Sequence, residues 1–101
     1  MIGAPILAER PLVTLGSKPH LPKHARMQFD PVRQRLAVLA PERVYWPDEI
    51  AAEILKLCDG QRSVAGISEH LAKEYAAPLG TIQADVLEFV QSWTDIRLLK
   101  L

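Results

Sequence analysis

The sequence predicts a small α+β domain of the winged-helix kind, in which an N-terminal three-stranded antiparallel sheet is followed by three helices. Short apolar or alternating segments fill residues 25–46, and longer segments with apolar residues at helical spacing fill residues 47–93. A length of 101 residues suits a single domain. Because all strand-like segments precede all helix-like ones, the order favours an α+β arrangement over alternating β and α units.

Residues 1–21 are predicted to form a separate N-terminal arm, and residues 22–101 the domain itself. Prolines and glycines recur through the arm, so neither a helix nor a long central strand can run through it. Two interpretations of the arm are open: it is disordered, or it docks on a partner.

Three short strands are expected at the start of the domain. Residues 25–30 alternate small or apolar with polar side chains, and residues 35–40 form a second, more apolar run that a hairpin can join to the first. A third, very short strand runs from Arg43 to Trp46 between Pro41 and Pro47. Flanking prolines are typical of an edge strand, so the third strand is the expected open edge of the sheet.

The first helix is expected from Pro47 to Cys58. Proline suits a first helical turn because its nitrogen needs no partner there, and the acids that follow favour the positive end of a helix. Gly60 then allows the left-handed conformation that commonly ends a helix. The residues expected to face the core form one apolar stripe: Ile50, Ile54, Leu57 and Cys58.

Two further helices are expected, with Ser63 capping the second and Thr81 capping the third. Apolar residues at helical spacing form the core face of the second helix: Val64, Ile67, Leu71 and Tyr75. The core face of the third helix is an arc of Ile82, Val86, Phe89 and Trp93. Three residues to one side of that arc widen the face: Gln83, Leu87 and Val90. Residues 96–101 are either a short strand or a tucked tail.

Charge is balanced over the whole chain but not along it. Residues 1–46 hold seven Lys and Arg against three Asp and Glu, and residues 47–101 hold five against nine. Three helices after a small sheet also fit an alternative function, that of a winged-helix DNA-binding transcription regulator. The third helix has no Lys or Arg between Thr81 and Trp93, so its surface would repel phosphate. This composition counts against DNA binding.

Few groups that could converge on a catalytic or metal site are present. Cys58 is the only cysteine, so the chain cannot form an intrachain disulfide, and this fits a reducing compartment. Cys58 lies on an apolar stripe, where a cysteine usually behaves as a small buried hydrophobic residue. His20 and His24 are four residues apart, but Pro22 prevents the helix that would align them as metal ligands. The sequence shows no Gly-rich phosphate loop, signal peptide or membrane-length apolar run. We expect a cytoplasmic protein that is not an enzyme and that uses no cofactor, metal, nucleic acid or membrane.

The remaining class of function is recognition of a peptide through backbone hydrogen bonds and an adjacent apolar groove. An edge strand exposes amides and carbonyls that an extended peptide can complete, and the widened flank of the third helix can take peptide side chains. Periodicity alone favours the alternative, in which Tyr45 and Trp46 are core aromatics and Leu87 and Val90 are packing residues.

Several sequence runs in combination resemble the PqqD family over about residues 22–101. The resemblance rests on Phe29-Asp30-Pro31, Ala52 to Leu57, Cys58-Asp59-Gly60, Val64 with Ile67 and Leu71, and Asp85 to Phe89. It implies a winged-helix-like RiPP recognition element, which is a peptide chaperone without catalytic activity. Such a protein binds the ribosomal precursor peptide PqqA of pyrroloquinoline quinone (PQQ) biosynthesis and presents it to the radical S-adenosylmethionine (SAM) enzyme PqqE.

The resemblance also implies where the peptide binds. In the family, the peptide adds as a strand beside the third strand and lies against the third helix. On this chain, the implied peptide-binding residues are Arg43, Val44, Tyr45, Trp46, Gln83, Leu87 and Val90. This mapping agrees with the edge strand and the widened helix flank, and it reverses the preference for the packing interpretation. Short edge strands also permit strand exchange, so a monomer and a strand-exchanged homodimer are both open.

Overall fold

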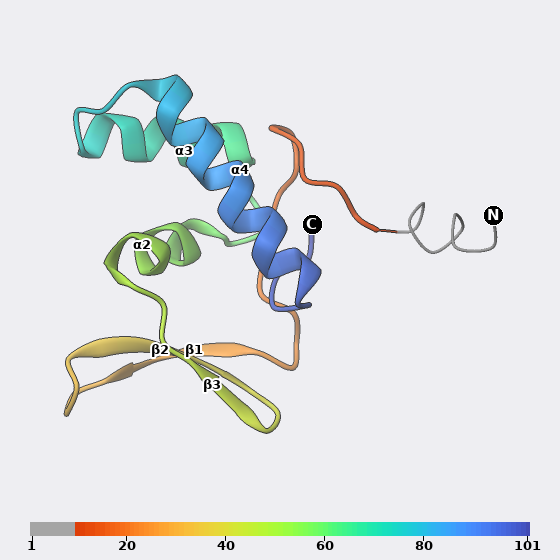
Figure 1. The fold of residues 1–101 in the computed structure, drawn as a ribbon, viewed down its shortest axis with the longest axis vertical. Helices are drawn as coiled ribbons and strands as arrows, with labels where there is room; N and C mark the ends of the chain where they lie inside the picture. The colour runs from red at the N-terminus through yellow and green to blue at the C-terminus, as the bar shows by residue number, and fades with distance from the viewer. Residues whose placement is uncertain (1–9) are drawn as a thin grey trace.

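The computed structural model describes residues 10–101, and it confirms the α+β class (Figure 1). The sheet contains β1 (Arg26–Asp30), β2 (Arg35–Ala40) and β3 (Arg43–Tyr45), and the helices α2 (Glu49–Leu57), α3 (Val64–Glu74) and α4 (Leu79–Asp95) follow it. The sheet lies at one end of the molecule, and the C-terminal end of α4 is the end nearer to it (Figure 1).

All pairing in the sheet is antiparallel, in the order β1-β2-β3. Asp30 fixes the first hairpin, because its Oδ1 accepts hydrogen bonds from the Val32 and Arg33 amides at 2.9 and 3.2 Å. The second hairpin turns through Pro41 and Glu42. Strand β3 ends at Tyr45, so the prediction that Trp46 belongs to the strand is wrong by one residue.

Helix α2 begins two residues later than predicted. Pro47 does not start the helix, because the Asp48 carboxylate caps it by accepting a hydrogen bond from the Ala51 amide at 2.8 Å. The buried stripe is also rotated from the expected one: Ile50 is 56% exposed, whereas Leu55 is fully buried. The helix ends as predicted before Gly60, whose φ is +79°.

Ser63 caps α3 as predicted, since its Oγ accepts a hydrogen bond from the Gly66 amide at 3.1 Å. Two expectations about the later helices are wrong. Tyr75 is the C-terminal cap of α3 and is 47% exposed, so it does not belong to the buried face. Thr81 does not cap α4, because that helix already begins at Leu79, after Pro78.

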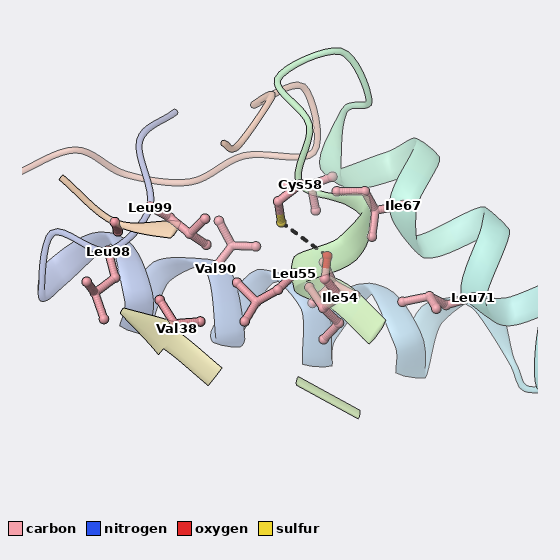
Figure 2. Close-up of a cluster of buried hydrophobic side chains, with 12 residues drawn as sticks. Val38, Ile54, Leu55, Cys58, Ile67, Leu71, Val90, Leu98 and Leu99 are labelled. Carbon is pink, nitrogen blue, oxygen red and sulfur yellow. Dashed lines mark hydrogen bonds between the residues drawn. The ribbon is translucent and has the colours of Figure 1, made fainter. Parts of the chain in front are cut away.

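The core lies where β2 and all three helices meet (Figure 2). Its members come from every layer: Val38 from β2, Leu55 from α2, Ile67 from α3 and Val90 from α4, with Leu99 from the segment after α4. Figure 2 shows Val38 of the sheet and Val90 of α4 within the same cluster of buried side chains. None of the helices in residues 10–101 has the length and apolar character needed to cross a membrane.

The described part of the N-terminal arm docks on its own domain, which neither interpretation of the arm anticipated. Pro19 is fully buried, and the Ser17 carbonyl accepts a hydrogen bond from the Val64 amide at 2.9 Å. His20 and Lys100 exchange two backbone hydrogen bonds of 2.8 Å each. These bonds hold the C-terminal segment in place as a tail paired with the arm. Residues 1–9 lie outside the described part.

Candidate functional site

The edge of β3 away from β2 pairs with no other strand within residues 10–101, so its outward backbone groups are open to pairing. Ala40 and Arg43 flank a two-residue turn, so they form the hydrogen-bonded pair that closes the hairpin. Bonded and non-bonded pairs alternate along an antiparallel ladder. The N–H and C=O of Val44, which is opposite Leu39, therefore point away from β2 toward the open edge.

Aromatic side chains connect the inner face of β3 to α4. The ring centroids of Tyr45 and Trp93 are 6.0 Å apart, and those of Phe89 and Trp93 are 5.2 Å apart with nearly parallel planes. All three residues are half-buried, so part of each ring remains accessible. The free edge of β3 thus lies next to an aromatic face of α4.

The outer face of β3 is apolar and cationic. Val44 is 51% exposed and Trp46 is 37% exposed. The guanidinium carbons of Arg33 and Arg35 lie 5.1 and 5.6 Å from the Trp46 ring centroid, and Arg35 also donates to the Trp46 carbonyl at 3.2 Å. These cation–π contacts hold the indole against the sheet.

The residues predicted on α4 do not all lie beside β3. Val90 is fully buried in the core, so its side chain is below the surface. Leu87 and Phe89 are two residues apart, which places them roughly 160° apart around a helix. The structure shows α4 meeting β3 through the Tyr45–Trp93 contact, with Phe89 stacked on Trp93, and Leu87 is turned away from that contact by roughly 120° around the helix.

The arm covers the side of α4 that carries Leu87. Gln91, one turn after Leu87, accepts a hydrogen bond from the Val13 amide at 2.9 Å and donates one to the Pro11 carbonyl at 3.0 Å. Gln83 is one turn before Leu87, on this same side. Sequence reasoning assigned Phe89 and Trp93 only to the core face. The sequence signal for them was two aromatic residues four apart on the helix.

A hollow of about 610 Å³ lies at the turn end of β3. The turn residues and Arg43 form one wall, and Ile96 and Leu98 after α4 form the other.

The surface of α4 is acidic. The exposed residues of α4 include Asp85 and Glu88, and the whole helix lacks Lys and Arg. This surface is unsuited to nucleic-acid phosphate.

The thiol of Cys58 is not a reactive group in this fold. Its Sγ donates to the Ile54 carbonyl at 3.2 Å (Figure 2), and burial raises the pKa of the Cys58 thiol to about 12. Among residues 10–101, no group of three His, Cys, Asp or Glu side chains is arranged to hold a metal ion.

An open edge strand next to an aromatic helix face defines a class of small α+β domain that can bind an extended peptide by strand addition. Comparison with known proteins narrows this class. The chain belongs to the PqqD family, because the family model described as coenzyme PQQ synthesis protein D (PqqD) matches residues 35–99.

Relatives along most of the chain carry the name PqqA binding protein. The protein from Rhodopseudomonas palustris strain HaA2 is 54% identical over 83 residues, covering 82% of this chain and 81% of the relative. The protein from Bradyrhizobium diazoefficiens strain USDA 110 is 48% identical over the same shares of the two chains. The protein from Xanthomonas oryzae strain PXO99A is 40% identical over 88% of this chain and 97% of the relative.

Two solved structures share the fold. The solution structure of the PqqD truncation of Methylobacterium extorquens PqqCD, described as a functional and stand-alone RiPP recognition element, is 34% identical with a TM-score of 0.78. That match covers 92% of this chain and 99% of the other. The crystal structure of PqqD from Xanthomonas campestris is 37% identical with a TM-score of 0.57, covering 88% and 99% of the two chains.

Proposed function

We propose that this chain is a peptide chaperone of PQQ biosynthesis, which binds the precursor peptide PqqA without acting on it chemically. The names of the relatives and the recognition-element description of the Methylobacterium protein support this assignment. The observation that carries it here is the outward-facing backbone of Val44 next to Tyr45 and Trp93.

The peptide adds as a fourth strand to β3 in this proposal. Its backbone pairs with the N–H and C=O of Val44, and its side chains alternate between two surfaces because successive residues of a strand point to opposite faces. One surface is the exposed pair Val44 and Trp46, and the other is the aromatic face of Phe89 and Trp93. Gln83 and Leu87 stay predicted contacts that the geometry does not favour.

Presentation of the bound peptide to PqqE is the second part of the proposal, and we assign it to the cytoplasm, where precursor peptides are made. Strand addition occupies only the β3 edge and the adjoining face of α4. The other surfaces of the domain are left for the enzyme. Strand exchange between two copies would use the same edge as the peptide, so we propose that the monomer is the form that binds PqqA.

Replacement of Val44 by proline tests the binding mode. The Val44 amide makes no ladder bond to β2, so Val44→Pro removes an outward donor and leaves the β2–β3 pairing in place. We expect PqqA affinity, measured by calorimetry, to fall roughly tenfold, because a donor is lost and the ring blocks strand approach. Val44→Thr keeps the amide and the β-branched shape, and it should bind as the wild type does. Equal affinity of the proline and threonine variants would contradict strand addition at β3.

A further inference from the structure

A second cavity, of about 770 Å³, lies where the segment before β1 meets the segment after α4. Residues 20–24 form one wall, Arg97 and residues 99–101 form the other, and Thr94 and Pro11 complete the lining. We call it the arm–tail cavity. Its volume is within the roughly 300–1,000 Å³ that is typical of small-molecule sites. It shares only His24 with the hollow at the turn end of β3.

A buried hydroxyl in the lining lacks a hydrogen-bond partner. Thr94 is 7% exposed, and its Oγ1 has no partner within residues 10–101. A threonine inside a helix ordinarily satisfies its hydroxyl on the carbonyl one turn earlier, which Thr94 does not do. Leaving such a group unpaired is unfavourable, and because the oxygen itself is buried, a ligand in the cavity would pair with it only after a small shift of the wall.

Cationic side chains stand on both walls of the cavity. Lys23 is on one wall, and Arg97 and Lys100 are on the other. Within residues 10–101, none of the three has a carboxylate within ion-pair distance.

Nearby acids are already engaged elsewhere. Asp95 forms a 2.7 Å ion pair with Arg10, and the Asp59 carboxylate accepts hydrogen bonds from the Gln61 and Arg62 amides. Among the described residues, no Asp or Glu lines the cavity, and Lys23, Arg97 and Lys100 supply cationic side chains.

The two walls are joined at fixed points. The Nε2 of His24 donates to the Arg97 carbonyl at 3.1 Å, and backbone bonds join His20 to Lys100. Arg97 has a φ of +64°, in the left-handed region that glycine adopts with less strain. The chain thus holds an arginine at the cavity in a backbone conformation that suits a glycine better.

We propose that the arm–tail cavity binds a small organic anion with more than one carboxylate. Cations on opposite walls suit separated negative charges, and the Arg97 guanidinium matches the geometry of a carboxylate. Apolar residues such as Leu21 and Leu99 would contact the body of the ligand.

Citrate is a suitable probe for this site, with the full chain labelled for amide NMR and with parallel calorimetry. We expect saturable shifts at Thr94, Arg97 and Lys100. Triethyl citrate, which carries no carboxylate, should cause no such shifts. Shifts that do not saturate, or equal shifts from inorganic phosphate at matched ionic strength, would overturn the proposal.

Arg97→Gly separates binding from folding. Because glycine adopts a positive φ readily, this variant should melt at or above the wild-type temperature while its citrate affinity falls at least about fivefold. Lys73→Gln removes a positive charge from the exposed surface of α3 and should bind citrate as the wild type does. Wild-type affinity in Arg97→Gly, or an equal loss in Lys73→Gln, would refute a specific carboxylate site.

Discussion

The Tyr45 and Trp93 rings are tilted by 54° with centroids 6.0 Å apart, and this contact brings the edge strand β3 next to α4. Aromatic pairs at this separation and tilt are favourable beyond their buried area. In the proposed binding mode, the contact determines which side of α4 faces a peptide added to β3. That side carries Phe89 and Trp93, and the opposite side carries Gln91 and the docked arm.

Two alanine variants on α4 distinguish its two flanks. Phe89→Ala should weaken PqqA binding roughly tenfold, because it removes an aromatic surface beside β3. Leu87→Ala should change affinity less than about twofold. Both residues are half-buried and pack on the core, so each variant should lose about 1–3 kcal/mol of unfolding free energy. Calorimetric affinities, compared with denaturant melts, separate the two effects. The opposite ranking of affinities would place the peptide on the flank predicted from sequence.

The docked arm depends on the Gln91 carboxamide. Its Nε2 donates both to the Pro11 carbonyl and to Asp95 Oδ1, the second at 2.9 Å. Gln91→Glu replaces that donor with an acceptor facing two acceptors, so residues 11–14 should detach. We expect protection of the Val13 amide in hydrogen exchange to fall at least tenfold, on the order of 1–3 kcal/mol. Ser92→Glu adds the same charge at the neighbouring exposed position and should leave protection unchanged.

Cys58 should be inert in the folded protein and should make stability depend on pH in alkali. Burial, with a smaller contribution from Asp59, raises the pKa of the thiol from 9.0 to about 12. As pH rises, the Cys58 thiol therefore ionises in the unfolded chain before it ionises in the folded one. Its contribution to the unfolding free energy is at its maximum below pH 9.0 and falls as pH rises toward about 12.

Two measurements check the behaviour of Cys58. A thiol reagent at pH 8 should modify it only at the rate of unfolding, and Cys58→Ala should flatten the fall in stability above pH 9. Fast modification of the native protein would show that the thiol is accessible.

The strands and their turns could be predicted from the sequence because prolines lie between them. Pro41 and Pro47 bound β3 to within one residue. The helix faces were harder to predict. Capping by Asp48 sets the start of α2, and Leu55 turns inward while Ile50 turns out, which periodicity alone did not resolve.

Tertiary geometry decided the rest of the candidate site. Leu87 and Phe89 are both apolar residues on α4, and the crossing of the helix over the sheet, which no local pattern encodes, selects the one beside β3. Docking of the arm was equally invisible in the sequence. It depends on backbone hydrogen bonds such as that from Val64 to Ser17, which any residue other than proline at position 64 would permit.

A titration of the isotopically labelled chain with PqqA, followed by amide and indole NMR, tests the central claim most directly. If the peptide adds to β3 against α4, the largest shifts should fall on Val44 to Trp46 and on the indole N–H of Trp93. The amides of β1, on the opposite edge of the sheet, should hardly move. Shifts concentrated on β1, or none at saturating peptide, would contradict strand addition at β3.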